Sequence, residues 1–225
     1  MKNSSRVAEP QQDRSRESLE RVMEAGLEVL AEGGWQEFTI ARVCERAGVS
    51  VGMIYRRFHG REDLLIALQD RWLESAAAGV AALLSDEPVW ARLGPRDALH
   101  RAIMAFIEVM RGEEDRTRVL GAQSALDSEM LARLARISHA YSDWFRTVML
   151  RFSDAMPHDD PTAAADFTFR MVFDMTIRRI THGDDYATGS SVGDWDRFGE
   201  RLTDVGTSYL FPAQAADDPI VARKR

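Results

Sequence analysis

The residues best suited to bind a charged partner gather in one short window, residues 39–61. This window holds five arginines and a single carboxylate, Glu45, so its formal net charge is +4 before any histidine is counted. The arginines are Arg42, Arg46, Arg56, Arg57 and Arg61. A local cluster of guanidinium groups is the chemistry that neutralises nucleic-acid phosphates. The window therefore predicts a phosphate-binding face.

The charge of the whole chain points the other way. The 225 residues carry 29 Lys and Arg against 36 Asp and Glu, a formal net charge of −7, whereas a nucleic-acid-binding domain is usually basic. The residues outside the window must then carry −11. We therefore expect residues 39–61 to face nucleic acid and the acidic remainder to face away from it.

Two short helices that cross at a tight turn would present this window. Thr39 is a typical N-cap for a helix over 40–47, Gly48 breaks that helix, and Ser50 caps a further helix that runs to about Phe58. The apolar residues that can close on one another are Ile40, Val43, Ala47, Val49, Ile54 and Phe58. This pattern predicts a helix-turn-helix, whose second helix enters the DNA major groove.

The rest of the chain also follows a helical pattern. Apolar residues recur at three-to-four spacing from Arg16 until Gly33 and Gly34, and no window alternates as a half-buried strand would. Further helices are expected over about 61–84, 95–112, 114–126, 128–155, 160–182 and 193–210, with a linker over 85–94. The sequence therefore predicts an all-α fold.

The run from about Ser18 to Leu68 resembles the DNA-binding domain of the TetR family of bacterial transcriptional repressors. The residues that carry the resemblance are Gly34, Trp35, Phe38, Thr39, Ala47 to Ser50, Gly52, Ile54, Tyr55, Phe58, Arg61, Leu64 and Leu65. As a combination they are far more specific than the periodicity of a helix-turn-helix alone.

The resemblance implies roles for individual residues. Thr39 and Tyr55 stand where the family places a threonine and a tyrosine that contact phosphate, and Arg61 stands where a phosphate-binding lysine is usual. The first turn of the recognition helix, where base edges are read, consists of Ser50, Val51, Gly52 and Met53.

Two of these residues depart from the family pattern. Val51 stands where Arg, Lys or Gln is common, and Met53 where Ser, Thr or Ala is common. Apolar side chains can touch thymine methyl groups but cannot make a bidentate contact with a purine, so Arg56 is the best candidate for reading a base. The expected DNA-contacting residues are Thr39, Arg42, Ser50, Val51, Gly52, Met53, Tyr55, Arg56, His59 and Arg61.

In TetR relatives, the helices after the helix-turn-helix form a domain that dimerises and often holds a small-molecule pocket. The resemblance thus implies an N-terminal three-helix DNA-binding domain followed by a larger helical bundle for regulation and dimerisation. The expected boundaries are a flexible arm at 1–15, the DNA-binding domain at 16–60, the ligand-binding and dimerisation domain at 61–211, and a flexible tail at 212–225.

Methionines and aromatic residues of the larger domain favour a pocket for a small apolar or aromatic effector, because methionine repacks easily and aromatic rings offer flat area. The expected lining residues are Ile103, Phe106, Ile107, Met110, His139, Tyr141, Trp144, Phe145 and Val148. Tyr141, His139 or Arg146 would supply the polar contact. Each of the apolar residues, taken singly, is explained more simply as bundle core.

The last two long helices carry apolar stripes that favour a dimer interface. The residues are Phe167, Met171 and Met175 on one helix and Phe198, Leu202, Val205 and Tyr209 on the other. Two such helices from each subunit would form a four-helix bundle, and the homodimer would present two recognition helices to a near-palindromic operator. The alternative is that these residues cover the protein's own core and the chain is monomeric.

Other kinds of chemistry find little support. The single cysteine, Cys44, lies on an inward helix face and cannot form an internal disulfide or a multi-cysteine zinc site. The five histidines are scattered, and no phosphate loop, nucleophile elbow or HExxH motif occurs, so we expect no metal, no cofactor and no enzyme. Without a secretory signal or a membrane-spanning stretch, we expect a cytoplasmic protein with no membrane partner.

The sequence therefore predicts a ligand-responsive, homodimeric DNA-binding regulator, a repressor, whose partner is double-stranded operator DNA. Two alternatives stay open. The first is a DNA-binding protein that has no small-molecule effector and is regulated by a protein partner or not at all. The second is a helical interaction module whose helix-turn-helix serves only for packing.

Overall fold

The fold is all-α, as predicted, in a computed structural model that describes residues 9–84, 90, 92–124, 128–183, 189–191 and 193–212. Its helices are α1 (Glu9–Glu37), α2 (Ile40–Ala47), α3 (Val51–Tyr55), α4 (Arg61–Leu84), α6 (Pro95–Gly112), α7 (Glu114–Ser124), α8 (Ser128–Met149), α9 (Pro161–His182) and α10 (Trp195–Leu210). A 3₁₀ helix, η1 (Leu150–Ala155), follows α8. No strand occurs in the described residues.

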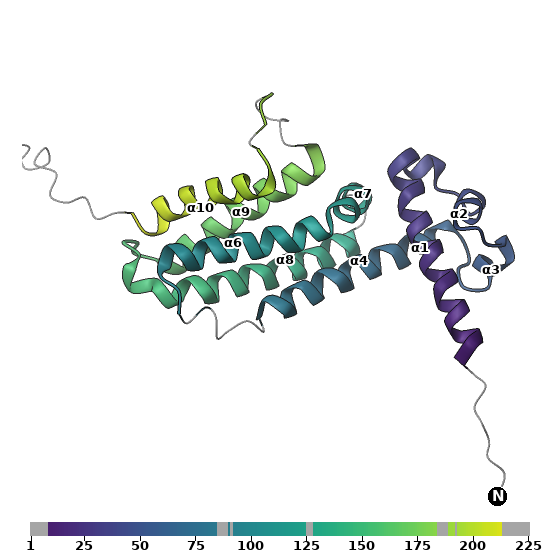
Figure 1. Ribbon diagram of the computed structural model, residues 1–225, viewed down its shortest axis with the longest axis horizontal. Helices are drawn as coiled ribbons and strands as arrows, with labels where there is room; N and C mark the ends of the chain where they lie inside the picture. The colour runs from purple at the N-terminus through teal and green to yellow at the C-terminus, as the bar shows by residue number, and fades with distance from the viewer. Residues whose placement is uncertain are drawn as a thin grey trace, which may run out of the picture.

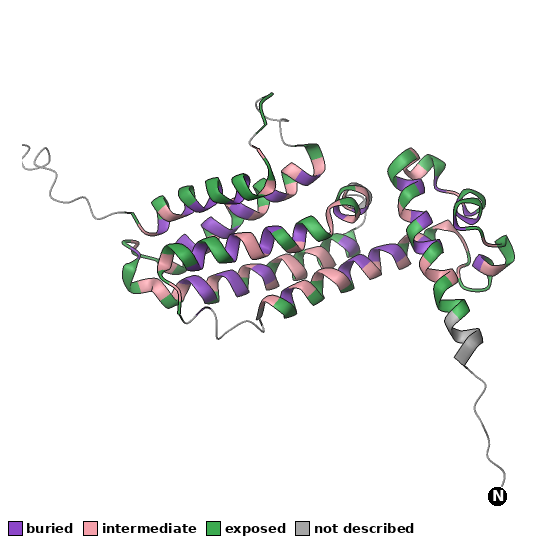
Figure 2. Cartoon of the chain, in the orientation of Figure 1, coloured by how far each residue is buried: buried purple, intermediate pink, exposed green. Residues whose placement is uncertain are grey.

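The molecule is elongated, with two parts joined by α4 (Figure 1). Helices α1, α2 and α3 form a head at one end, and α4 runs from the head into a bundle with α6, α8, α9 and α10. Helix α7 lies between the two parts and contacts α1, α4 and α9. Buried residues follow the inward faces of the helices in both parts (Figure 2).

One apolar cluster holds the head together. Phe38, Val43, Ile54 and Leu64, from four successive parts of the chain, are fully buried in it. The same cluster includes Leu120 of α7 and Met130 of α8. The head therefore shares its core with two helices of the larger part.

The core of the bundle is centred on aromatic side chains. Phe106 of α6 packs against Tyr141, Phe169 and Phe173, with ring centroids 5.3, 5.4 and 6.0 Å away. Helix α10 packs closely against α6 beside this core, because the residues of α10 that face α6 are small. A methyl group added at Gly206 would lie 3.1 Å from Cδ2 of Leu99.

The predicted breaks within the head are confirmed, and one helix is longer than predicted. The predicted glycine break falls at Gly34, whose φ of 60° interrupts α1, and Gly48 takes the left-handed conformation with φ 64° after α2. Helix α1 already begins at Glu9, inside the segment predicted as a flexible arm. Pro10 is tolerated in a first helical turn, and the polar residues that follow it form helix without an apolar period.

Two other helices are shorter than predicted. Helix α3 ends at Tyr55 instead of Phe58, because the N–H groups of Arg57 and Phe58 both donate to the carbonyl of Ile54 and turn the chain. Helix α8 ends at Met149, where the chain tightens into η1. The predicted tail, apart from residue 212, the arm before residue 9 and most of the 85–94 linker lie outside the described residues.

Gly79 allows α4 to pass close to α6 and α8. An added methyl group would lie 2.6 Å from Cγ1 of Val109 and 2.8 Å from the hydroxyl of Tyr141. We expect Gly79→Ala to lower the free energy of unfolding, measured in urea. Overpacking destabilises a protein by about 1–3 kcal/mol, whereas the higher helix propensity of alanine stabilises it by at most about 1 kcal/mol.

Gly121 of α7 is the matched control. A methyl group there meets no heavy atom within 4 Å, so Gly121→Ala is expected to raise the free energy of unfolding by up to about 1 kcal/mol. Equal stabilisation by both substitutions would contradict the packing described for Gly79.

Candidate nucleic-acid interface and effector cavity

Helix α2 is held firmly against α1. Its N-cap Thr39 accepts a hydrogen bond from the backbone N–H of Arg42 at 3.3 Å. At its other end, Nε of Arg21 in α1 donates to the carbonyl of Ala47 at 3.3 Å. The predicted N-cap role of Thr39 is thereby confirmed, and its phosphate contact stays a prediction.

The short helix α3 turns one face inward and the other outward. Ile54 is fully buried, whereas Val51 and Tyr55 are 45% and 56% exposed. A methyl group added at Gly52 would meet nothing within 4 Å, so packing within the chain does not require glycine there. Ser50 stands at the N-cap, but its side chain makes no cap hydrogen bond. The first turn of α3 therefore presents a smooth outward surface that a DNA groove can approach closely.

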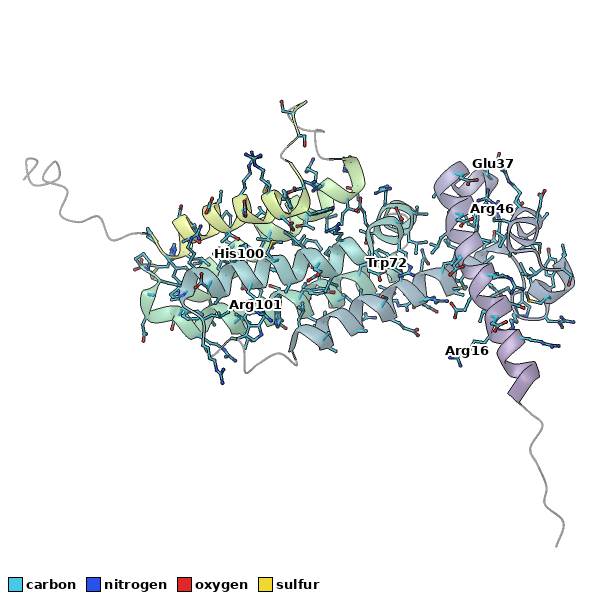
Figure 3. All side chains as sticks on the ribbon, viewed as in Figure 1. Arg16, Glu37, Arg46, Trp72, His100 and Arg101 are labelled. Atoms are coloured by element: carbon cyan, nitrogen blue, oxygen red, sulfur yellow. The ribbon has the colours of Figure 1, made fainter. Side chains whose placement is uncertain are left out.

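Two of the five arginines are paired with glutamates of α1. These glutamates lie outside residues 39–61, so the charge count over that window does not include them. Arg46 forms a two-bonded ion pair with Glu32 at 2.9 and 2.6 Å and also contacts Glu28 at 2.9 Å, and Arg42 pairs with Glu37. The hydrogen bond from Arg46 lowers the pKa of Glu32. Arg46 and Glu37 lie together on the head in Figure 3. The net charge of +4 thus overstates the positive charge of this surface.

Of the five arginines in residues 39–61, Arg56 has the fewest internal contacts. Within the part of the chain that the structure describes, its side chain is exposed and has no ion pair or hydrogen bond. By contrast, the neighbouring Arg57 donates to the hydroxyl of Ser15 at 2.6 Å. Arg56 therefore has the best-placed positive charge for an external partner.

Arg61 and His59 both have partners within the head. The guanidinium carbon of Arg61 lies 4.2 Å from the ring centroid of Trp35, and its Nε contacts Glu62 at 3.3 Å. A flat guanidinium stacks on an indole better than an ammonium does, which accounts for arginine at this position. The backbone N–H and Nδ1 of His59 contact Asp63 at 2.9 and 2.8 Å, which lowers the pKa of that carboxyl.

A partly open cavity of about 260 Å³ lies where the head meets the bundle, between α4, α6, α7, α8 and α9. Trp72, which lines it, marks this junction in Figure 3. Of the predicted pocket residues, Met110 and Tyr141 line the cavity. Sequence reasoning missed the α7 residues Thr117 and Gly121, whose small side chains leave space opposite larger apolar residues.

The other predicted pocket residues do not line this cavity. The buried ones, Ile103, Phe106, Ile107, Trp144, Phe145 and Val148, belong to the bundle core. His139 is exposed, and Arg146 pairs with Asp143 and Asp166 on the outside of α8 and α9. Apolar spacing in the sequence shows which residues are buried, not where packing leaves a space, so the effector contacts of these residues stay a prediction.

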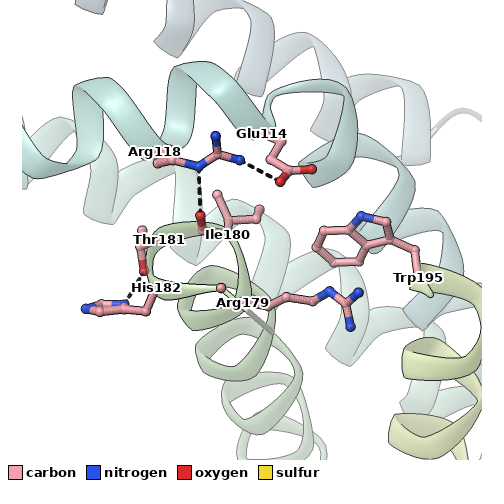
Figure 4. A pocket seen from close by; sticks show the side chains of 8 residues that line it. Glu114, Arg118, Arg179, Ile180, Thr181, His182 and Trp195 are labelled. Carbon is pink, nitrogen blue, oxygen red and sulfur yellow. Dashed lines mark hydrogen bonds and ion pairs between the residues drawn. The ribbon is translucent and has the colours of Figure 1, made fainter. Parts of the chain in front are cut away.

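A second, open hollow of about 330 Å³ lies between the start of α7 and the end of α9 (Figure 4). Nη2 of Arg118 contacts Glu114 at 2.7 Å, and its Nε donates to the carbonyl of Ile180 at 3.2 Å. Arg179 stacks over Trp195, with 4.4 Å from its guanidinium carbon to the ring centroid. These contacts join α7 to α9 and the start of α10.

The predicted dimer stripe divides into exposed and buried residues. Phe167, Met175, Val205 and Tyr209 are exposed and Met171 is half-buried, with the rings of Phe167 and Tyr209 5.4 Å apart. Phe198 and Leu202 are buried in the protein's own bundle core, so their assignment to an interface was wrong. The small residues Gly199 and Gly206 let α10 approach α6 closely and bury that side of the helix.

The family model of the bacterial regulatory proteins of the tetR family matches residues 22–68, which cover the head and the start of α4. Residues 22–68 are therefore a DNA-binding domain of the tetR family. An uncharacterised HTH-type transcriptional regulator of Mycobacterium bovis is 33% identical over 86 residues, a match that covers 36% of this chain and 44% of the relative. The chain thus matches less than half the length of this curated relative.

Solved structures extend the likeness in fold to most of the chain. A tetR-family regulatory protein from Rhodococcus RHA1 superposes with a TM-score of 0.66 at 18% identity, over 87% of this chain and 98% of that one. FadR from Bacillus subtilis, solved with stearoyl-CoA, superposes with a TM-score of 0.57 at 18% identity. The match covers 85% of this chain and 99% of that one. At such identities the comparison shows a shared TetR-like fold.

Two further features bear on the predicted exclusions. In the described ranges, no group of three metal-ligating side chains lies together. No helix among those residues is both long and apolar enough to cross a membrane. Cys44 is free and buried as predicted, and burial raises the pKa of its thiol.

We expect Arg56→Ala to weaken binding to duplex DNA by about tenfold, because a charged side chain in contact with DNA is lost. The slope of log K against log salt concentration is expected to become about 1 smaller in magnitude. Fluorescence anisotropy over a range of salt concentrations measures both quantities. Arg46→Ala removes the same formal charge from a residue already paired with α1 and is expected to have a much smaller effect. Equal losses in the two variants would contradict the role given to Arg56.

Proposed function

We propose that this TetR-family transcriptional regulator is a repressor that binds a near-palindromic operator as a homodimer and is released by a small, mainly apolar ligand. The observation that carries the proposal is the outward face of α3, which exposes Val51, Tyr55 and Arg56 while Ile54 anchors the helix in the core.

On DNA, the first turn of α3 would lie in the major groove. Val51 and Met53 would touch thymine methyl groups, and Arg56 would reach a base edge or a phosphate. Thr39 and Tyr55 would bind phosphates on either side of the groove. Residues 16–60 would thus serve as the DNA-binding domain, and residues 61–211 as the ligand-binding and dimerisation domain.

The homodimer would form through the exposed residues of α9 and α10. The described residues leave eight large hydrophobic side chains exposed, and four of these lie on this one surface: Phe167, Met175, Val205 and Tyr209. Contiguous exposed apolar surface of this kind is typical of protein interfaces. Pairing of both helices across a two-fold axis would bury the surface in a four-helix bundle.

Ligand control would pass through α7. Thr117 and Gly121 line the cavity, while Leu120 on the same helix is fully buried in the cluster that holds the head. A ligand can release DNA only if it binds one arrangement of the heads more tightly than the other. Because α7 contacts both α1 and α9, a change in its position would alter how the head sits on the bundle.

Selection from a random duplex library with the full chain tests the function. We expect enrichment of a near-palindromic sequence with half-sites about 10 bp, or a multiple of that, apart. The double variant Met175→Asp, Val205→Asp is expected to sediment as a monomer and to lose enrichment of the paired sites, because burying unpaired carboxylates is unfavourable.

Leu131→Asp is the matched control, since Leu131 is similarly exposed but lies on α8. This variant is expected to remain dimeric and to select the same paired sites. If the wild-type chain enriches no sequence, the proposed function is wrong. If the double variant stays dimeric, the interface is wrong.

A further inference from the structure

We propose that the cavity between α4, α6, α7, α8 and α9 takes a compact, mainly apolar ligand of about ten non-hydrogen atoms that is neutral or cationic and donates a hydrogen bond. Fatty acids and acyl-CoA thioesters are excluded. The inference rests on the proposed function and names the chemical class of its effector.

The size of the cavity sets the size of the ligand. An apolar cavity of roughly 150 Å³ holds benzene, whereas pockets for drug-sized ligands begin at about 300 Å³. The cavity here measures about 260 Å³, which in proportion to benzene accommodates about ten non-hydrogen atoms. Trp72 and Phe173 are among its lining residues, and their flat rings favour a planar ligand.

The residues that line the cavity include a carboxylate and no cationic side chain, so an anionic ligand would find no charged partner there. Glu113 is the single charged residue among those that line it, and its side chain is mostly buried. The carboxylate accepts hydrogen bonds from the hydroxyl of Ser75 at 2.6 Å and from Nη1 of Arg116 at 2.9 and 3.0 Å. Arg116 is not a lining residue, so a ligand meets the carboxylate and not the guanidinium.

Tyr141 is another lining residue, and the charge of Glu113 acts on its hydroxyl. Burial first, and the negative charge of Glu113 second, raise the pKa of the Tyr141 hydroxyl. Tyr141 itself is occupied, because its hydroxyl donates to the carbonyl of Ala76 at 3.0 Å. A second negative charge in this apolar space would be repelled and would also lose its hydration.

An unsatisfied hydroxyl shows where the ligand's polar group would lie. Thr117 is 3% exposed and lines the cavity, and its Oγ1 has no hydrogen-bond partner among the described residues. An unpaired buried hydroxyl costs about 1–3 kcal/mol. A ligand N–H or O–H group would satisfy this oxygen or the Glu113 carboxylate, both of which accept hydrogen bonds.

This ligand class differs from that bound by the FadR of Bacillus subtilis, which was solved with stearoyl-CoA. A long acyl chain with an anionic nucleotide head needs far more volume than about 260 Å³, and the cavity lining offers it no cationic side chain. Shared fold at 18% identity therefore does not extend to a shared effector.

Thermal unfolding of the full chain with four probes tests the proposal. The probes are indole, which has fused rings and one N–H donor; indene, a hydrocarbon with the same ring skeleton; octanoate, an anion of similar size; and stearoyl-CoA. Indole is expected to raise the Tm in a concentration-dependent way and indene to raise it less, because a ligand that binds only the folded state stabilises it. Octanoate and stearoyl-CoA are expected to leave the Tm unchanged.

Variants locate the effect in the cavity. Ala76→Leu fills it and is expected to abolish the indole shift, whereas Ala77→Leu, on the exposed side of the same helix, is expected to keep it. Thr117→Val is expected to raise the Tm of the free protein and to weaken the binding of indole, but not of indene, by about fivefold.

Absence of an indole shift, a shift that survives Ala76→Leu but not Ala77→Leu, or an equal or larger shift with octanoate or stearoyl-CoA would overturn the ligand class. None of these outcomes affects the selection of operator DNA. A failed DNA selection would overturn the proposed function and would leave the result with the four probes unchanged.

Discussion

The recognition helix α3 has only five residues, too few to be stable alone in water, because helix nucleation is costly. Its position therefore depends on packing, and Ile54 is its one fully buried side chain. The left-handed Gly48 aims the chain from α2 towards this contact, and the carbonyl of Ile54 then accepts from Arg57 and Phe58 to turn the chain out of the helix. The outward-facing residues of α3 itself are placed by this anchor, beside which Met53 is partly buried.

The cluster that receives Ile54 does not belong to the head alone. Leu120 of α7 and Met130 of α8 pack into it, so the head cannot shift without disturbing helices of the larger part. On the other side of α7, Thr117 borders the cavity. The candidate interface and the cavity are therefore separated by one helix, through which the proposed ligand would act on a surface that it does not touch.

Much of the fold follows from local signals in the sequence. Thr39 and Gly48 mark the ends of α2, Pro95 and Pro161 begin α6 and α9, and all four bounds were predicted within a residue. The fold of the N-terminal domain and its family were also predictable, because the motif fixes residue types at many positions. The start of α1 at Glu9 was missed because the sequence of its first turns has no apolar period.

The remaining errors concern contacts between elements distant in sequence. The pairing of Arg46 with Glu28 and Glu32 joins α2 to α1, and no local charge count can include it. Phe198 looked like interface because its apolar stripe was considered without Gly199, the neighbour that draws this side of α10 onto α6. The cavity was misplaced because it arises from imperfect packing around α7, which depends on the whole arrangement of helices.

Hydrogen exchange of the full chain with and without duplex DNA at low salt tests most directly that α3 and its flanks form the nucleic-acid interface. Low salt strengthens the contacts with phosphate and makes a sequence-specific site unnecessary. We predict that DNA slows exchange in residues 39–42 and 50–61, while α6 and the exposed face of α9 and α10 remain unchanged. Protection confined to the bundle, or no protection at 50–61 in a saturated complex, would contradict the account.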